Sequence, residues 1–287
     1  MPELPEVETI ASGLVPLVCG RRIQEVRLIS SHMIIGDELF FRQRLKSRII
    51  RNVRRRAKLL IMDMDDPVHL VFHLKMTGKV WVPGERADPN KHTHMILALK
   101  GGQDIFFEDQ RKFGYVAAMT PEELGCWSFY AGLGPEPLQL EVEDFVNIFR
   151  HRKARIKSLL LDQRVIAGIG NIYADEALYL AGIHPCAAPS EIPPDKLAGL
   201  HHCLREVLLA AIKAGGSSFR NYRNALGSAG NFQESFLVYG KKDHSCQKCG
   251  SVIETVKVSG RTSCFCPHCQ AGANRAQMIS CSRLTRD

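Results

Sequence analysis

Leu133-Gly134-Pro135-Glu136-Pro137 divides the sequence into two segments of different character. Its two prolines restrict the backbone and remove two amide donors, so the stretch cannot continue a regular helix or a central strand. Before it, short apolar segments alternate with Gly-Gly and Pro-Gly turns; after it, longer segments carry apolar residues at helical spacing. The stretch predicts a stiff linker between a β-rich first domain and a helical second one.

The segment from Val26 to about Tyr115 has the short, strand-like pattern of a β-sandwich or barrel. Its expected strands are residues 59–64, 68–74, 79–82, 95–99 and 104–108. One helix, residues 6–18, is expected before them. The helices expected after the linker are residues 142–149, 154–161, 172–181 and 195–214.

Basic residues are concentrated in two places. The chain has 38 Lys and Arg against 30 Asp and Glu, a net charge of +8. Residues 42–58 hold nine basic side chains and residues 150–157 hold five, with no acid in either run. A solvated surface would explain one such cluster, whereas two favour binding to a polyanion, DNA or RNA.

The N-terminal region contains acidic residues and no apolar core of a signal peptide. No apolar run has the length of a membrane span. These features predict a location in the cytoplasm or another compartment that contains DNA, with no membrane partner.

Four cysteines near the end of the chain have the spacing of a metal site. Cys246-x2-Cys249 and Cys266-x2-Cys269 are separated by 16 residues. Two CxxC turns can give four thiolates to one tetrahedral Zn²⁺, whereas a redox CxxC does not come as a spaced double pair. Cys264 is an alternative ligand, but Cys-Pro-His-Cys completes the CxxC turn with Cys266.

Two further features could bind phosphate. The residues between the CxxC pairs alternate as in a β-hairpin and place Arg261 at its tip, after a glycine. Gly168-Ile169-Gly170-Asn171 is expected to begin a helix, whose free N–H groups and Asn171 side chain could hold an anion. Gly-x-Gly also makes ordinary turns between helices, and because no strand precedes it, it is not a dinucleotide-binding motif.

Residues 2–8, Pro-Glu-Leu-Pro-Glu-Val-Glu, point to a nucleophile. Removal of Met1 would expose the secondary amine of Pro2, and an α-amino group titrates near pH 8, well below a lysine at about 10.4. With the Glu3 carboxylate beside it as an acid or base, this amine could form a Schiff base. Alternatively, the stretch is only the acidic start of the first helix.

Together, these features resemble the formamidopyrimidine-DNA glycosylase family over about residues 2–269. The matching motifs, in chain order, are residues 2–8, Arg56-Ala57-Lys58, His73-Leu74-Lys75-Met76-Thr77-Gly78, Arg111-Lys112-Phe113-Gly114, residues 133–138, Gly170-Asn171-Ile172-Tyr173-Ala174 and the zinc finger. The resemblance implies an α+β chain: an N-terminal helix and β-sandwich (1–134), a helix–two-turn–helix domain (135–230), a C-terminal β-hairpin zinc finger (231–270) and a tail (271–287).

The resemblance also implies a role for individual residues. Pro2 would attack C1′ of a damaged nucleotide, Glu3 would help to open the sugar ring, and Lys58 would hold a phosphate near the lesion. The residues expected to bind the DNA backbone or the lesion are Glu6, Lys157, Asn171 and Arg261, and Glu176 joins Lys157 as a position of suspected catalytic relevance. The residues expected to fill the hole left by the flipped nucleotide are Met76, Arg111 and Phe113.

The implied activity is that of a bifunctional glycosylase and abasic-site lyase of base excision repair. It would remove oxidised purines, 8-oxoguanine and formamidopyrimidines, from double-stranded DNA and nick the strand by β- and δ-elimination. One structural Zn²⁺ at Cys246, Cys249, Cys266 and Cys269 and no small-molecule cofactor are implied. The protein would be a cytoplasmic monomer associated with the nucleoid.

The chain departs from the family's pattern in two places. The family often has Asp-Pro-Arg-Arg-Phe-Gly where this chain has Asp109-Gln110-Arg111-Lys112-Phe113-Gly114, and the loss of proline predicts a less rigid loop. Residues 215–230, which correspond to a loop over the damaged base, match poorly, so lesion preference is the least defined property.

Two alternatives remain open. A sister enzyme of the same fold removes oxidised pyrimidines, but typically begins Pro-Glu-Gly-Pro-Glu. A non-catalytic protein could use the same fold to bind lesions, and retention of Met1 would favour it, because an acylated nitrogen cannot form a Schiff base.

Overall fold

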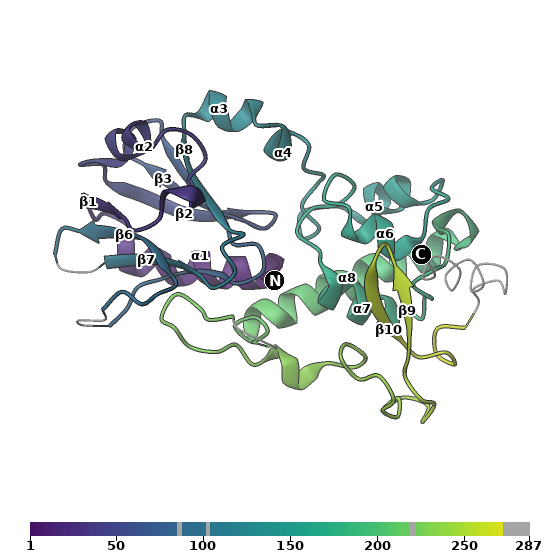
Figure 1. Cartoon of the computed structure of the whole chain (residues 1–287). Helices are drawn as coiled ribbons and strands as arrows, with labels where there is room; N and C mark the ends of the chain where they lie inside the picture. Colours follow the sequence, from purple (N-terminus) through teal and green to yellow (C-terminus); the bar gives the residue numbers. More distant parts are fainter. Residues whose placement is uncertain (85–87, 102–103, 219–221, 272–287) are drawn as a thin grey trace. The chain divides into compact units, whose positions relative to one another are not determined.

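The computed structural model describes residues 1–84, 88–101, 104–218 and 222–271 (Figure 1). They form two compact units, each described here by itself. The first unit contains Met1–Gly132 and Ala211–Gln233, and the second contains Leu133–Ala210 and the chain from Glu234 onward. The tail expected at residues 271–287 lies outside the described residues, apart from its first residue.

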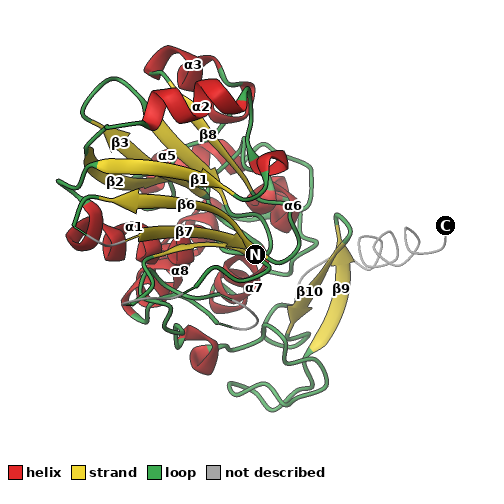
Figure 2. Cartoon of the chain, turned by 60° about the vertical axis from the view of Figure 1, so that its left-hand side comes forward, coloured by secondary structure: helices red, strands yellow, loops and turns green. Residues whose placement is uncertain are grey.

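The first unit is built on two antiparallel four-stranded sheets, drawn as yellow arrows in Figure 2. One sheet has the order β1-β6-β7-β5 and the other the order β2-β3-β4-β8. The strands of the first sheet are β1 (Ile23–Leu28), β5 (Gly78–Trp81), β6 (Thr93–Leu99) and β7 (Asp104–Asp109). Those of the second sheet are β2 (Ile50–Arg56), β3 (Leu59–Met64), β4 (His69–His73) and β8 (Tyr115–Met119). The predicted sandwich is confirmed.

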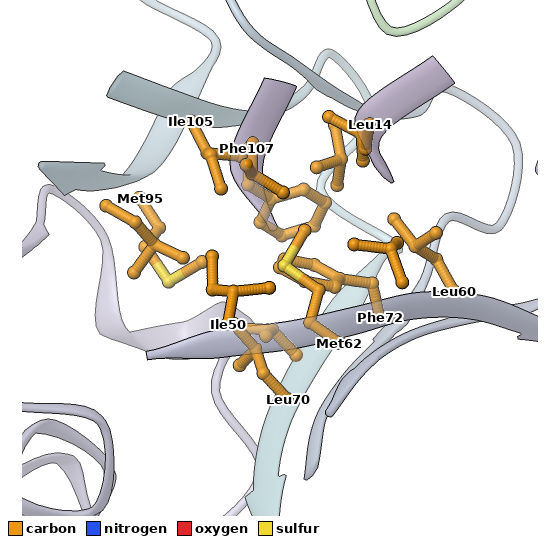
Figure 3. Packing of buried hydrophobic residues seen from close by; sticks show 14 of the residues in the cluster. Leu14, Ile50, Leu60, Met62, Leu70, Phe72, Met95, Ile105 and Phe107 are labelled. Carbon is orange, nitrogen blue, oxygen red and sulfur yellow. The ribbon is translucent and has the colours of Figure 1, made fainter. Parts of the chain in front are cut away.

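Alternate side chains of the two sheets meet in one apolar core (Figure 3). Successive side chains of a strand point to opposite faces, so β3, β4, β6, β7 and β8 give every second residue to this core. The rings of Phe72 from β4 and Phe107 from β7 meet edge to face across the two sheets, with centroids 5.5 Å apart. Helix α1 (Leu4–Val18) adds an apolar stripe, which includes Leu14. The core therefore fixes the start of α1 against the sandwich.

A short helix, α2 (Glu38–Leu45), interrupts the segment in which strands are expected. Asp37 caps it by accepting the N–H of Phe40 at 2.8 Å, and Arg42 pairs with Glu38 one turn earlier. Sequence reasoning missed this helix because a cap and an ion pair, rather than an apolar stripe, mark it. Two further helices, α3 (Pro121–Cys126) and α4 (Ser128–Ala131), follow β8, the last strand of the sandwich.

The second unit is helical and ends in a hairpin. Its elements are α5 (Val142–Phe149), α6 (Ile156–Leu161), α7 (Asn171–Leu180), α8 (Pro194–Lys213), β9 (Glu254–Val258) and β10 (Arg261–Phe265). The last residues of α8 are part of the first unit. The four predicted helices are confirmed with small shifts at their ends, and the hairpin pairs Arg261 with Val258 at its turn. In the described ranges, no helix is long and apolar enough to cross a membrane.

The side chain of Gln163 holds the turn between α6 and α7. Its Oε1 accepts the N–H of Gly168 at 2.8 Å, and its Nε2 donates to the carbonyl of Ile169 at 2.9 Å. Gly168 has a φ of 84°, which glycine adopts without a steric penalty. The backbone carbonyl of Gln163 also accepts the N–H of Gly134 in the linker at 2.8 Å. These contacts set where α7 begins, and therefore where Asn171 lies.

Candidate active site, DNA contacts and zinc centre

Pro2 and Glu3 lie buried at the start of α1. The carboxylate of Glu6 accepts the N–H of Glu3 at 2.8 Å, as the glutamate of a capping box does. Its other oxygen accepts the N–H of Ser217, also at 2.8 Å. Glu6 thus connects the N-terminal residues to the segment that follows α8. Its predicted contact with DNA stays a prediction.

The approach of residue 216 to α1 requires glycine. Gly216 has a φ of +81°, and a Cβ there would lie 3.2 Å from the Glu6 side chain and 3.0 Å from the Tyr222 ring. The Tyr222 hydroxyl donates to the backbone carbonyl of Glu6 at 3.3 Å. Burial, and then the charge of Glu6, raise the pKa of Tyr222, so the phenol keeps its proton and remains a donor.

Lys58 is buried in the two-residue turn between β2 and β3, next to Ala57, which has a positive φ of 54°. Burial, with the charges of Lys75 and Lys58, lowers the pKa of His73 to about 3. Its imidazole is therefore neutral at neutral pH, and its Nδ1 accepts the N–H of Lys75 at 3.1 Å. At neutral pH, His73 therefore adds no positive charge to that of the two lysines, and the predicted contact of Lys58 with phosphate stays a prediction.

The three predicted wedge residues lie on two loops at the same end of one sheet. Met76 belongs to the loop before β5, and Arg111 and Phe113 to the loop after β7; β5 and β7 are paired there, Gly78 with Asp109. Phe113 is 55% exposed and Met76 is 36% exposed. The guanidinium of Arg111 lies 4.7 Å from the centre of the Phe113 ring. Two exposed apolar side chains with a stacked cation suit contact with bases.

Sequence reasoning missed Asp109 and Thr77, whose side chains join these two loops by a hydrogen bond. A local signal was available, because aspartate commonly binds nearby backbone N–H groups at turns. Gln163 was also missed. A single side chain that binds the backbone of a turn leaves no periodic pattern in the sequence.

Asn171 and Arg261 are brought together in the second unit. Asn171 is the first residue of α7, and its Nδ2 donates to the carbonyl of Thr262 at 3.0 Å. Arg261 directly precedes Thr262 at the start of β10, and its side chain is exposed. The contact of these two residues with phosphate stays a prediction, but the hairpin and the helix start that carry them are joined.

Lys157 is fully buried, and its predicted contact with DNA stays a prediction. Its Nζ donates to Asp175 at 2.6 Å and to the hydroxyl of Ser263 at 2.7 Å, and lies 3.4 Å from the carbonyl of Thr262. The side chains of Lys157 and Asp175 are both 0% exposed. The second carboxylate oxygen of Asp175 accepts the N–H of Cys264 at 3.0 Å. Lys157 therefore holds β10 against the helices.

Glu176 has a similar structural position. Its carboxylate accepts the backbone N–H groups of Leu237, Val238 and Tyr239 at 2.8 to 3.0 Å. Burial raises the pKa of Glu176 in spite of these three donors. The residue anchors the segment that leads into the zinc finger, and its suspected catalytic relevance stays a prediction.

The sulfur atoms of four cysteines lie within 4.8 Å of one another: Cys246, Cys249, Cys266 and Cys269. This spacing fits a tetrahedral ion with Zn–S bonds of about 2.3 Å. Cys264 is outside the cluster, because it belongs to the strand that Asp175 holds. The hydroxyl of Tyr179 lies 3.1 Å from the Cys246 sulfur and supports that ligand from outside. The four thiolates hold one structural Zn²⁺, which links the two CxxC turns.

The basic cluster of residues 42–58 is largely paired with acids from elsewhere in the chain. Its ion pairs include Arg42 with Glu38, Arg44 with Glu123, Arg48 with Asp66, Arg54 with Asp63 and Arg55 with Glu8. In the second cluster Arg150, Arg152 and Lys153 are exposed, whereas Lys157 is not. The number of consecutive basic residues therefore overstates the positive charge that faces solvent.

Three family models match consecutive parts of the chain. They are the formamidopyrimidine-DNA glycosylase N-terminal domain at residues 1–116, the formamidopyrimidine-DNA glycosylase H2TH domain at 133–223, and the zinc finger found in FPG and IleRS at 244–272. The formamidopyrimidine-DNA glycosylase of Chloroflexus aggregans is 44% identical over 276 residues, covering 94% of this chain and 98% of that one.

Solved structures agree. A Lactococcus lactis FPG mutant in complex with Fapy-dG containing DNA superimposes with a TM-score of 0.88 at 35% identity, covering 94% of this chain and 100% of that one. The complex of Lactococcus lactis Fpg with abasic-site DNA gives the same values. Family models over most of the chain, a relative at 44% identity and the common fold lead to one conclusion. The chain belongs to the formamidopyrimidine-DNA glycosylase family.

Proposed function

We propose that this chain removes oxidised purines, 8-oxoguanine and formamidopyrimidines, from double-stranded DNA and then cleaves the strand at the abasic site. Its similarity to formamidopyrimidine-DNA glycosylases over 94% of its length supports this activity. The observation that carries the proposal is the start of α1, where Pro2 and Glu3 are adjacent and buried, and where the Glu6 carboxylate binds the N–H of Glu3.

Pro2 is the nucleophile in this proposal. Once Met1 is removed, its unprotonated secondary amine attacks C1′ of the damaged nucleotide, the base leaves, and the nitrogen forms an iminium with the opened sugar. The iminium acidifies the C2′ proton, so that β- and δ-elimination follow and the strand is cut. One amine thereby accounts for both activities.

Glu3 supplies the proton that opens the sugar ring. A positioned general acid typically contributes about 10²- to 10⁴-fold to the rate. Because its backbone N–H is bound to Glu6, the residue has a defined orientation at the helix start. Glu6 in turn connects this start to Ser217, the first residue after the two glycines that follow α8.

The DNA contacts are divided between the two units. In the first unit, Lys58 holds a phosphate close to the lesion, and the wedge of Met76, Arg111 and Phe113 fills the space that the extruded nucleotide leaves. In the second unit, Asn171 and Arg261 bind backbone phosphates, since they meet at the hairpin through Thr262. We propose the domain limits 1–134, 135–230 and 231–270 and a monomer that acts in the cytoplasm on nucleoid DNA.

Borohydride trapping tests the reaction. The native protein, with Met1 removal checked by intact mass, is incubated with a duplex that contains 8-oxoguanine opposite cytosine. A covalent protein–DNA adduct is expected, because borohydride reduces the imine. A form that retains an acylated N-terminus should bind the duplex and give no adduct. Damage-specific binding by both forms without any adduct would contradict the enzyme and leave a lesion-binding protein.

A pair of matched variants tests the acid. Glu3→Gln should lower the single-turnover excision rate by about 10²-fold or more, with little change in DNA affinity. The control is Glu25→Gln, which removes the charge of an exposed residue on β1.

Relative excision of 8-oxoguanine and thymine glycol by the native protein decides between purine and pyrimidine lesions. Preference for thymine glycol would contradict the proposal.

A further inference from the structure

Thr77 and Asp109 form a side-chain contact between the two wedge loops. Asp109 ends β7 and is 0% exposed. One of its oxygens accepts the Thr77 hydroxyl, and the other accepts the N–H of Gly114 at 2.6 Å. The N–H of Arg111 points between Thr77 Oγ1, at 3.0 Å, and the first oxygen of Asp109, at 3.1 Å. The Asp109 carboxylate therefore binds both ends of the loop that carries Phe113. It also binds the hydroxyl of Thr77, the residue next to Met76.

The burial of Asp109 makes this contact strong. A buried carboxylate is costly unless its oxygens accept hydrogen bonds, and hydrogen bonds to a charged acceptor are about twice as strong as neutral ones. Asp109 receives two backbone N–H groups and one hydroxyl. The loops are thus held from inside by polar contacts, which leaves the side chains of Met76 and Phe113 exposed for another partner.

Both loops contain backbone conformations that need such support. Lys75 and Lys112 have positive φ values of 48° and 58°, which residues other than glycine adopt only when their surroundings hold them there. A Cβ at Gly114 would lie 3.0 Å from the Asp109 carboxylate, so the loop approaches the carboxylate as closely as glycine permits. Gln110 has no ring that restricts φ as proline does, and the restraint has to come from contacts such as those of Asp109.

We propose that Thr77 and Asp109 are positioning residues for the wedge, so that Met76, Arg111 and Phe113 enter the DNA as one preformed group. This inference rests on the proposed function of the wedge. Side chains that are already held in the inserted arrangement lose less conformational entropy than chains that must be ordered during insertion. The benefit arises at the step in which a paired, stacked nucleotide is displaced, and disappears where no base has to be unstacked.

Two conservative variants separate this role from general stability. Thr77→Val keeps the shape of the side chain and removes only the bridging hydroxyl. Asp109→Asn replaces one carboxylate oxygen by an NH₂ group, so that only one of the two N–H contacts can still find an acceptor. Thr120→Val is the matched control, because Thr120 caps α3 in the same unit by accepting the N–H of Glu123 at 3.2 Å and touches neither loop.

Each protein is compared on two duplexes under single-turnover conditions. One contains 8-oxoguanine opposite cytosine, and the other has an abasic site at the same position. We expect both variants to excise 8-oxoguanine about 10- to 100-fold more slowly, since misplacement by about 1 Å has effects of this size. Borohydride trapping at the abasic site should slow by less than about threefold, because no base is unstacked there. Thr120→Val should leave the ratio of the two rates unchanged.

The outcomes distinguish the inference from the function on which it rests. If the native protein neither excises 8-oxoguanine nor is trapped, the proposed function has failed. If the native protein is active and the variants lose equal activity on both duplexes, Thr77 and Asp109 are ordinary structural residues and the inference is overturned. Unchanged rates on both duplexes overturn it as well.

Discussion

The sandwich of the first unit and the zinc-finger region of the second are stabilised by different interactions. In the sandwich, all eight strands and α1 contribute to one continuous apolar core. Around the zinc centre, the buried cluster contains three metal-binding or neighbouring cysteines among its six members, with Tyr179, Val238 and Ile253. Much of the remaining cohesion there comes from polar contacts: Lys157 with Asp175 and Ser263, and Glu176 with three backbone N–H groups.

The difference shows where each unit is vulnerable. Apolar burial is non-directional and spread over many side chains, so a single polar change at the edge of the sandwich has a local effect. Buried polar contacts and metal bonds are few and directional, and each leaves an unsatisfied group when its partner is removed. The position of the hairpin that carries Arg261 therefore depends on a small number of specific interactions, whereas the strands from which the wedge loops extend are held by the apolar core.

Removal of zinc should have the largest effect. The apparent free energy of binding at structural zinc sites is about 10–16 kcal/mol, so a chelator should unfold the region around the two CxxC turns and abolish binding to damaged DNA. The chain's two tryptophans, Trp81 and Trp127, lie in the first unit and report on the sandwich alone. Their thermal unfolding curve should change little. A large loss of sandwich stability on chelation would contradict the distinction between the two units. Cys126→Ala, which removes a thiol outside the zinc site, is the control.

Lys157→Met should have the next largest effect. Breaking a buried ion pair by removing one partner typically costs about 3–5 kcal/mol, because the other charge stays buried without compensation. Zinc release during urea unfolding measures this loss in the second unit, while tryptophan fluorescence should give an unchanged midpoint. The double variant Lys157→Met with Asp175→Leu should recover much of the stability. Equal destabilisation by the single and double variants would show that burial of the uncompensated charge is not the cause.

His73→Asn should change how the sandwich responds to pH. The pKa of His73 is lowered to about 3, whereas an unfolded histidine titrates near 6.5, so the unfolded state binds more protons between these values. The native state therefore loses stability as pH falls through this window, by up to about 1.4 kcal/mol per pH unit. Urea unfolding followed by tryptophan fluorescence at pH 6, 5 and 4 should give a shallower slope in the variant. A parallel pair of slopes would remove His73 as the cause.

Arg27→Gln should have the smallest effect. Arg27 pairs with Glu25 on β1, and the two side chains are 51% and 60% exposed. Exposed ion pairs contribute about 0–1 kcal/mol, so the unfolding midpoint should shift hardly at all. Arg27→Gln and Lys157→Met each remove one basic side chain, the first from the surface of the first unit and the second from the interior of the second unit. A loss similar to that of Lys157→Met would contradict the distinction.

Periodic features of this protein could be predicted from the sequence. Strands show alternating apolar residues, the four helices after the linker show helical spacing, and the zinc-binding cysteines form two CxxC pairs. Each of these patterns can be recognised within a short stretch of sequence. The helix α2 could not be found this way, since it buries only Phe41 and Leu45 and begins at a cap. Individual functional residues were identified through resemblance to a family, because a residue such as Arg261 has no local signature of its own.

Long-range side-chain contacts account for what the sequence left undetermined. Residues 42–58 contain no acid themselves, yet in the fold Arg44 meets Glu123 and Arg55 meets Glu8, both distant in the chain. Lys157 belongs to a basic run and is nevertheless fully buried. Charge along a sequence predicts surface charge only where the fold brings no opposite charge nearby.

The contact between Glu6 and Ser217 indicates how libraries for altered lesion preference should be designed. Glu6 binds the backbone N–H of Ser217, which every residue except proline retains, so small side chains that fit this buried position keep the contact. Gly216 should be left unchanged, because a Cβ there would meet Glu6 and Tyr222. A library can thus vary the side chain at position 217 near the start of α1. Every member would keep the hydrogen bond that holds the segment after α8 against α1.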